Sequence, residues 1–376
     1  MRIKKILNLN FTSPETGSGI VAVKELQYFE KAGFEVKFAF CNKETSYNKL
    51  EVPFEVIKID KLPVLFKHPE ADFTFNSMSK LEFEHYQKEI AIQVEKIIND
   101  FQPDLIVVNH VWTLAYEISL YHVPYVIWCH GTDIARIQDP DPNWQKFKHF
   151  ADKALVGAKK VLFPSGAVRD RFLNTYPEYE DKTIVNHHGY DDNVFFPNPN
   201  YKWSPSPTKL VTVGAVDSSK GLHTLAKAME ILGEHYNLTW VGSCKDLDNV
   251  KNQYPHINFV GQKSHQDMAE ILRGSDIGVL ASEGVFEAFG LSALECMACG
   301  LPIVLSDMPC FREFTDSKFR EFFQPGDSEN LAQKIIKMNL LIVKHGSLVG
   351  NAAHKKSLEF LWEEHNKRLM NVIHNL

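Results

Sequence analysis

The sequence predicts an α/β protein made of two Rossmann-like domains in tandem. Short apolar strands alternate with amphipathic helices in both halves of the chain, and a Pro-rich polar segment at 195–207 separates the two series. A chain of 376 residues with 44% hydrophobic content is also long enough for two cores. We therefore expect an amino-terminal domain over residues 1–199 and a carboxyl-terminal domain over 200–357.

The first half has the pattern of a βαβ series. Its strands are short apolar runs, and its helices show apolar residues at a spacing of three and four. The expected strands cover about 3–10, 35–41, 54–59, 104–109, 123–129 and 161–164, and the expected helices cover about 19–32, 79–101, 111–121 and 144–159.

The second half repeats this pattern. The expected strands cover 210–213, 238–241, 257–260, 277–281 and 303–305, and the expected helices cover 222–234 and 266–274. A last amphipathic helix is expected from Ser357 to Ile373, with Leu361, His365 and Leu369 close to one face. We expect residues 358–376 to pack back on the first domain.

Bulk composition excludes several classes of protein. A formal charge of -6 argues against a dedicated nucleic-acid binder. The apolar region 105–129 is interrupted by polar residues and is no membrane span, and residues 1–10 fit a first strand better than a signal peptide. The six cysteines fit reduced thiols, including the Cys296/Cys299 pair, which has no partner at metal spacing. We expect a cytoplasmic protein, either free or peripheral at the inner face of the membrane.

The segment from Glu287 to Glu295, Glu-Ala-Phe-Gly-Leu-Ser-Ala-Leu-Glu, is the most informative part of the chain. It follows an apolar strand and opens a helix, so its turn lies at the carboxyl edge of a parallel sheet, where α/β proteins bind ligands. The helix amino terminus there attracts a diphosphate. With Glu287 on a sugar and Glu295 on a ribose, the pattern indicates a nucleotide-sugar site. The alternative is an ordinary first-turn acid and a surface glutamate.

The loop from Val213 to Gly221 has the composition of a phosphate site. It follows a strand, precedes a helix and holds small residues with one lysine. Backbone N–H groups from Gly214 onward, the Ser218 and Ser219 hydroxyls and the Lys220 ammonium could neutralise a diphosphate, a task that other enzymes give to Mg²⁺. The loop lacks P-loop spacing, and an ordinary βα turn with a solvated lysine is the alternative.

Gly17 and Gly19 form a second glycine turn, between the first strand and its helix, where backbone can approach a phosphate or a sugar closely. A dinucleotide oxidoreductase would have a third glycine, for which Ala22 is a tolerated substitute. The second strand, however, ends in Phe-Cys-Asn at 40–42 rather than in an acidic residue. Hydride transfer is therefore the weaker interpretation.

His130 begins the sequence His-Gly-Thr-Asp directly after the strand ending at Cys129. Its imidazole is expected at the carboxyl edge of the first sheet, facing any cleft between the domains, and this position favours a functional role over a structural one. Asp133 either caps the next turn or orients His130.

Other motifs have plainer explanations. The Asp-x-Asp sequences at 139–141 and 246–248 match metal-binding motifs in residue type but not in sequence context, so we expect no metal. Between Trp144 and Lys160, lysines alternate with aromatic residues. This pattern suits a membrane surface and suits an ordinary half-exposed helix equally well.

Together these motifs resemble the retaining glycosyltransferases of the GT-B fold, specifically family 4, the glycosyl transferases group 1. The resemblance covers nearly the whole chain and is strongest from Val213 to Asp307. It rests on the Val-Gly…Lys-Gly loop, the strand and loop Phe259-Val-Gly-Gln-Lys263, the EX7E motif at 287–295, and the segment Met297-Ala-Cys-Gly-Leu-Pro-Ile-Val-Leu-Ser-Asp307. It implies two Rossmann-like domains facing each other across a cleft, with the last helix crossing back to the first domain.

The resemblance also implies a role for each motif. Lys220 would bind the donor phosphates, Glu287 would contact the donor sugar, and His130 would lie by the sugar and the acceptor; these are the expected catalytic residues. The expected donor-binding residues are Gly17, Gly19, Gly214, Ser218, Ser219, Lys220, Gln262 and Lys263 near the base, Glu287, Phe289, Gly290 and Leu291 along the diphosphate, and Glu295 on the ribose.

The implied reaction moves a sugar from a nucleotide-diphosphate sugar, with UDP the commonest carrier in the family, to a hydroxyl acceptor. The anomeric configuration is kept, the leaving phosphate helps to deprotonate the acceptor, and neither cofactor nor metal is needed. The acceptor would be a glycan, a lipid-linked sugar or a small molecule, with no nucleic acid as partner.

One departure from the family pattern concerns the phosphate loop. The family usually has an arginine directly after Val-Gly, where this chain has Ala215. Either Arg136 or Arg273 compensates, or Lys220 and the helix terminus suffice, or donor handling is weakened. Ala215 therefore keeps a non-catalytic sugar-binding or partner subunit open as an alternative. A sugar-nucleotide epimerase or phosphorylase on the same fold is the other alternative.

Overall fold

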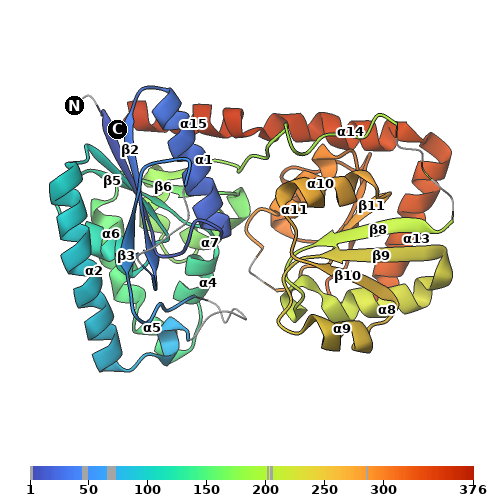
Figure 1. Cartoon of the computed structure of the whole chain (residues 1–376), viewed down its shortest axis with the longest axis horizontal. Coiled ribbons are helices and arrows are strands. Elements are labelled where there is room, and N and C mark those ends of the chain that lie inside the picture. Colours follow the sequence, from blue (N-terminus) through green and yellow to red (C-terminus); the bar gives the residue numbers. More distant parts are fainter. Residues whose placement is uncertain (1–2, 45–49, 66–72, 201–202, 204–205, 285–286) are drawn as a thin grey trace. The chain divides into compact units, whose positions relative to one another are not determined.

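A computed structural model describes residues 3–44, 50–65, 73–200, 203, 206–284 and 287–376. The chain divides into two compact units (Figure 1). Unit 1 comprises Met1–His187 and His365–Leu376, and unit 2 comprises His188–Glu364. The chain passes between the units at two points, and the Pro-rich segment 195–207 lies within unit 2.

Unit 1 is built on a parallel sheet in the order β3-β2-β1-β4-β5-β6-β7. Its strands are β1 (Lys5–Asn10), β2 (Glu35–Asn42), β3 (Phe54–Lys58), β4 (Leu105–Asn109), β5 (Tyr125–Trp128), β6 (Lys160–Phe163) and β7 (Thr183–Val185). Its helices are α1 (Gly17–Lys31), η1 (Phe75–Ser77), α2 (Lys80–Phe101), α3 (Thr113–Ile118), α4 (Thr132–Ile137), α5 (Pro142–Gln145), α6 (Lys148–Gly157), α7 (Gly166–Leu173), η2 (Pro177–Lys182) and most of α15 (Trp362–His374).

Unit 2 has a second parallel sheet, in the order β10-β9-β8-β11-β12-β13. Its strands are β8 (Thr208–Val213), β9 (Tyr236–Val241), β10 (Ile257–Gly261), β11 (Ile277–Leu280), β12 (Ile303–Ser306) and β13 (Arg320–Phe323). Its helices are η3 (Ser218–Lys220), α8 (Leu222–Leu232), η4 (Gly233–His235), α9 (Leu247–Gln253), α10 (His265–Arg273), α11 (Leu291–Ala298), α12 (Pro309–Arg312), α13 (Ser328–His345), α14 (Ser347–Ser357) and η5 (Leu358–Phe360).

The two sheets share one winding pattern, which confirms the predicted pair of Rossmann-like domains. In each sheet the first strand in sequence pairs with the second on one side and with a later strand on the other, β1 with β4 and β8 with β11. The strand order therefore reverses at these pairs. The carboxyl ends of such strands are the usual ligand-binding positions of open α/β sheets.

The carboxyl-terminal helix α15 packs with α1 on one face of the first sheet (Figure 1). Leu369, Met370 and Ile373 of α15 share a buried cluster with Leu26 and Phe29 of α1. The predicted helix began too early, because residues 358–360 form the separate turn η5 in unit 2.

A buried hydrogen-bonded contact ties α15 to α1. His365 Nε2 lies 3.0 Å from Glu25 Oε1, and both side chains are fully buried. Trp128 Nε1 donates to the same oxygen at 2.9 Å, and the indole ring stacks on His365. Burial raises the pKa of Glu25, and the hydrogen bonds and charge of His365 oppose that rise. One carboxylate therefore joins a helix, a strand and the end of the chain.

The helix expected at 144–159 is divided at Phe147 into α5 and α6. Trp144, Phe147 and Phe150 are all buried, Phe147 and Phe150 in contact with the Phe83 ring. The aromatic residues that suited a membrane surface thus lie in the core, so this segment is an ordinary half-exposed one. Within the described part of the chain, no helix is both long and apolar enough to cross a bilayer.

We expect Glu25→Ala to destabilise unit 1 by about 3–5 kcal/mol, because His365 and Trp128 would lose their buried acceptor. Chemical unfolding followed by tryptophan fluorescence measures this change. The matched control is His374→Gln at the exposed end of α15, where the change should stay within about 0.5 kcal/mol. Equal effects of the two substitutions would contradict a stabilising role of the pair.

Candidate active site

Lys220 and Glu287 meet at the carboxyl edge of the second sheet. Lys220 lies in the loop after β8, and Glu287 lies in the turn after the neighbouring strand β11. Lys220 Nζ donates to Glu287 Oε2 at 2.8 Å, and Ser282 Oγ donates to the same oxygen at 2.9 Å. The side chain of Glu287 is 12% exposed and that of Lys220 34%. Two residues 67 positions apart thus form one partly buried ion pair where the strand order reverses.

The pair holds both groups in their charged forms. The carboxylate of Glu287 raises the pKa of Lys220, although burial opposes this rise. Burial alone would raise the pKa of Glu287, but the charge and hydrogen bond of Lys220 and the hydrogen bond from Ser282 lower it below its usual value. The site therefore offers a cation that already has an anionic partner.

Two glycines are required by the close approach of neighbouring groups. At Gly221 (φ +72°) a Cβ atom would lie 2.1 Å from the Ala281 carbonyl oxygen, so this position keeps the loop tight against the end of β11. At Gly290 (φ +91°), which precedes α11, a Cβ atom would lie 2.3 Å from the Phe311 ring. Gly214 (φ +149°) is less constrained, since its Cβ would lie 3.3 Å from Lys220 Cγ.

The serines of the phosphate loop are arranged differently from the expectation. Asp217 Oδ1 accepts hydrogen bonds from the N–H groups of Ser219 (2.8 Å) and Lys220 (3.2 Å) and from the Ser219 hydroxyl. Ser218 is exposed. An internal carboxylate thus occupies donors that the sequence assigns to a phosphate, and a phosphate bound there would have to displace it.

The second glutamate of the EX7E motif lies on α11. Glu295 is partly exposed, and no hydrogen bond from the described residues reaches its carboxylate. Burial raises its pKa to about 8. Leu291 is the first residue of α11, whereas the Phe289 side chain is 2% exposed and packs against Phe314 and Phe360. The Phe289 ring therefore packs inside unit 2 and stabilises the turn, and it does not line a surface.

Gln262 and Lys263 are exposed in the loop that follows β10, at the same carboxyl edge of the sheet. The two arginines considered as substitutes at Ala215 have other partners in the structure. Arg273 ends α10 just before β11 begins, at the opposite edge of the sheet, and donates to the Val194 carbonyl oxygen. Arg136 in unit 1 donates to Leu65 O and Asp139.

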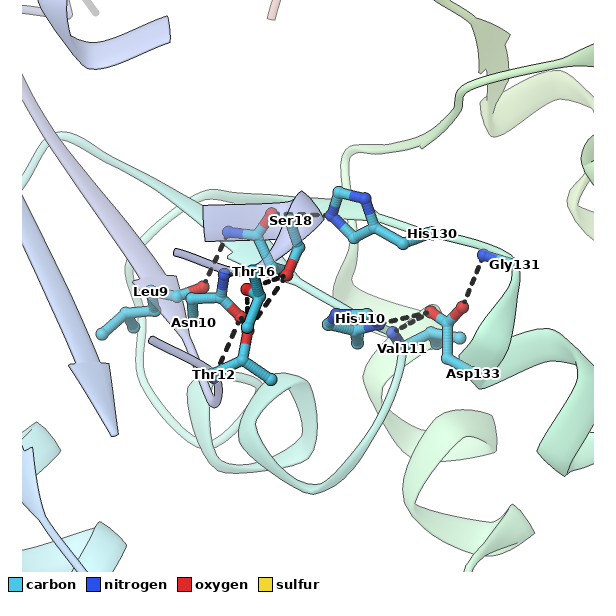
Figure 2. A network of polar contacts seen from close by, with 11 residues as sticks. Leu9, Asn10, Thr12, Thr16, Ser18, His110, Val111, His130, Gly131 and Asp133 are labelled. Carbon is cyan, nitrogen blue, oxygen red and sulfur yellow. Dashed lines mark hydrogen bonds and ion pairs between the residues drawn. The ribbon is translucent and has the colours of Figure 1, made fainter. Parts of the chain in front are cut away.

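In unit 1, a cluster of small polar side chains follows β1 (Figure 2). Asn10 Nδ2 donates to Ser18 Oγ at 3.1 Å, and Thr12 Oγ1 lies 2.9 Å from Thr16 Oγ1 and 3.0 Å from Ser18 Oγ. Thr16 caps α1 by accepting from the Gly19 N–H. A Cβ at Gly19 would lie 2.3 Å from Ser13 O, whereas nothing lies within 4 Å of the same position at Gly17. Gly19 is thus needed for the turn itself, and Gly17 leaves open space.

His130 lies beside this cluster, at the end of β5. Its Nε2 atom is 2.8 Å from Asn109 Oδ1, and its ring centre is 4.7 Å from that of His110 (Figure 2). His110 has a left-handed backbone (φ +69°) that is uncommon outside glycine. Burial lowers the pKa of His130 well below its usual value, with His110 adding to the effect, and lowers that of His110 to about 3.

Asp133 links the loop after β4 to the loop after β5 through hydrogen bonds. Its Oδ2 accepts from the Val111 N–H at 2.9 Å, and its Oδ1 accepts from the Gly131 N–H at 3.0 Å. Burial raises its pKa to about 6, although these N–H groups oppose the rise. Asp133 therefore fixes the backbone next to His130, while Asn109 bonds the imidazole itself.

The sequence singled out Lys220, Glu287, Glu295 and His130, but it gave no sign of the contacts that Asn109, His110, Asp217 and Ser282 make around them. One feature of the sequence could have pointed to Asn109 and His110: they are polar residues at the end of an apolar strand. Nothing in the sequence shows that the Asp217 carboxylate accepts hydrogen bonds from the N–H groups of its own loop. The two Asp-x-Asp sequences have structural partners: Asp139 pairs with Arg136, and Asp141 and Asp246 cap α5 and α9. No group of three metal-binding side chains occurs among the described residues.

Comparison with known proteins identifies the family. The model of Glycosyltransferase Family 4 matches residues 16–194, and the model of Glycosyl transferases group 1 matches residues 198–341. An uncharacterized glycosyltransferase of Methanocaldococcus jannaschii, MJ1178, is 23% identical over 64% of this chain and 66% of its own length. The chain spans between 46% and 66% of the length of the first three curated relatives.

Solved structures share the fold over the whole chain. Sucrose-phosphate synthase from Thermosynechococcus elongatus is 17% identical with a TM-score of 0.79, covering 99% of this chain and 98% of its own. Anabaena HepE, solved in complex with UDP, is 17% identical with a TM-score of 0.76, covering 99% of this chain and 100% of its own. Both family models and the fold agree with the motifs: the chain is a glycosyltransferase of the GT-B fold and belongs to family 4, the group 1 glycosyltransferases.

Proposed function

We propose that this enzyme is a retaining, metal-independent transferase that moves a sugar from a nucleotide-diphosphate sugar, with UDP as the carrier, to a hydroxyl acceptor. The observation that carries the proposal is the Lys220–Glu287 ion pair, placed where the strand order of the second sheet reverses and just before the amino terminus of α11. That UDP binds Anabaena HepE, a protein of the same fold, supports the choice of carrier.

In the proposed reaction, the donor diphosphate takes the place of Glu287 as the partner of Lys220. The amino terminus of α11 adds unpaired N–H groups and a partial positive charge, which stabilise the leaving phosphate without a metal ion. Glu287, once released, accepts a hydrogen bond from the sugar. The leaving phosphate then helps to deprotonate the attacking hydroxyl on the same face of the sugar, so the anomeric configuration is kept.

His130 and Glu295 are proposed to bind hydroxyl groups. Glu295 would hold the ribose of the nucleotide, and His130 would contact the sugar or the acceptor. Gln262 and Lys263 would lie by the base. The acceptor would be a glycan, a lipid-linked sugar or a small molecule, in a cytoplasmic protein that acts free or at the inner face of the membrane.

The competing functions make different predictions about products. An epimerase would convert a nucleotide sugar without releasing nucleotide, and a phosphorylase would need phosphate as the second substrate. A non-catalytic subunit, the alternative suggested by Ala215, would bind a nucleotide sugar without turnover. Acceptor-dependent release of nucleoside diphosphate distinguishes the transferase from all three.

We expect Lys220→Ala to lower the rate of transfer by roughly 10²–10³-fold, because the charge on the leaving phosphate would lose its cation. Nucleotide release from UDP-sugars is measured with and without a panel of glycoside and lipid-linked acceptors. The matched control is Lys227→Ala, an exposed lysine on α8, which should keep the full rate. NMR of the fresh product should show the donor's anomeric configuration. Full activity of Lys220→Ala, or an inverted product, would contradict the mechanism.

We expect donor binding to release protons from Glu295. With a pKa of about 8, the Glu295 carboxyl group is largely protonated at pH 7 before a donor binds. Ribose hydroxyls that donate hydrogen bonds to Glu295 would favour its carboxylate form. The affinity for UDP should therefore fall as pH drops below 8 and level off above it. Calorimetry at pH 7 in two buffers of different ionisation enthalpy measures the proton release. Glu295→Gln should abolish that release, and buffer-independent heats for the unmodified enzyme would contradict the ribose role.

A further inference from the structure

Unit 2 contains a cavity of about 320 Å³ at the edge of its sheet where the parallel strands begin. Its wall includes Arg273, at the end of α10 before β11, and Pro302, directly before β12. Lys220 and Glu287 lie at the opposite edge, after β8 and β11. Small-molecule sites in proteins have volumes of roughly 300–1,000 Å³. The cavity is therefore large enough for a small metabolite, and it is separate from the Lys220–Glu287 site.

The guanidinium group of Arg273 is a cation without an acidic partner. Its Nη1 donates to the Val194 carbonyl oxygen at 2.9 Å, and the group lies 4.5 Å from the centre of the Phe196 ring. No carboxylate of the described residues lies within ion-pair distance of it. Burial raises the pKa of the Cys299 thiol, also in the cavity wall, to about 12, and the charge of Arg273 opposes this rise. The charge of Arg273 therefore acts on the wall of the cavity.

The amino terminus of α14 supplies a second positive group. Gly346, the N-cap residue, and Gly350 both line the cavity, and because glycine has no side chain, the helix backbone itself forms this part of the wall. No side chain among the described residues caps α14, and its first turn has no acidic residue. The first N–H groups of a helix have no partner within the helix and carry a partial positive charge. These groups are therefore available to an anion.

Trp203 adds a donor from a third segment of the chain. It also lines the cavity, and the Nε1 atom of its side chain is buried without a hydrogen-bond partner in the described part of the chain. A buried N–H group without an acceptor is unfavourable, and native proteins pair nearly all such groups. The indole N–H thus lacks an acceptor that a ligand in the cavity could supply.

Two acceptors near the cavity are already bonded. Asp276 is the one acidic residue in the described wall, and its Oδ2 accepts from the Lys209 N–H at 2.7 Å. At the end of α11, the Ala298 carbonyl oxygen accepts from His354 Nδ1 at 2.9 Å. The groups that the wall leaves open to a ligand are therefore mainly donors.

We propose that this cavity is a second ligand site of the protein, which binds the phosphate group of a small phosphate monoester through Arg273, Trp203 Nε1 and the amino terminus of α14. Three donor groups from three segments suit the three terminal oxygens of a phosphate better than the two oxygens of a carboxylate. The remaining volume takes the organic part of the ligand, where the amides of Asn198 and Asn351 in the wall can bond its hydroxyl groups. The site does not depend on the proposed transferase function.

Calorimetric titration of the full chain tests the ligand class. The probes are glucose 6-phosphate, glycerol 3-phosphate, inorganic phosphate, glucose and citrate. We expect at least one of the two monoesters to bind more tightly than inorganic phosphate, and glucose not to bind. If neither monoester binds, or if citrate binds more tightly than both, the proposal is wrong.

Lys220→Ala separates this site from the donor site. A monoester bound in the cavity should keep its affinity in this variant and in the presence of saturating UDP. Loss of the monoester in either experiment would place it at the donor site and overturn the proposal. A chain that binds the monoester but no nucleotide would refute the proposed function and leave this proposal standing.

Two substitutions in the wall locate the phosphate group. Arg273→Gln removes the cation, and we expect it to weaken monoester binding by roughly tenfold or more. Because Arg273 also bonds Val194, Trp203→Phe is the second variant, which keeps an aromatic ring and removes the indole N–H; it should weaken binding by about threefold to tenfold. The matched control is Arg169→Gln in unit 1, an arginine paired with Asp170, which should keep the native affinity. Native affinity in both wall variants, or an equal loss in the control, would overturn the site.

Discussion

The Lys220–Glu287 ion pair is the interaction on which the account of this enzyme depends. It joins the loops after two neighbouring strands, and a glycine at 221 lets the first loop lie close enough to the second for the pair to form. Ala215 stands where the family usually has an arginine, and Arg273 lies at the other end of the β11 strand, so in the proposed function Lys220 binds the donor phosphates with help from the helix terminus. Glu287 raises the pKa of this lysine, and in the proposed function it would also compete with the donor phosphate for it.

The two units present different chemistry at equivalent places in the fold. In unit 2 the reversal of strand order carries an ion pair. In unit 1 it carries hydrogen-bonding side chains: hydroxyls after β1, and a buried asparagine at the end of β4 that bonds His130 after β5. In the proposed function, unit 2 would supply charge for the leaving phosphate and unit 1 would supply hydrogen-bonding groups for hydroxyls.

Much of this arrangement could be predicted from the sequence because it is local. The alternation of strands and helices is a local pattern, and the motifs at 213–221 and 287–295 are continuous in the chain, so the topology alone brings Lys220 and Glu287 to one edge. The Asn109 amide could not be predicted, since its orientation depends on Leu9 O about 100 positions away. Neither could the burial of Trp144 and Phe147, because their pattern with the lysines fits a membrane surface and a half-exposed helix equally well.

The most direct test of the ion pair is calorimetric titration of UDP, GDP and ADP into the native enzyme and into Glu287→Gln. These ligands carry no sugar, so Glu287 gains nothing from them and only competes for Lys220. We expect one diphosphate to bind, and to bind roughly tenfold more tightly to Glu287→Gln, equivalent to about 1.4 kcal/mol. This is close to the energy of one charged hydrogen bond. If none of the three binds, or if the variant binds more weakly than the native enzyme, Lys220 does not exchange Glu287 for the donor phosphate and the account is wrong.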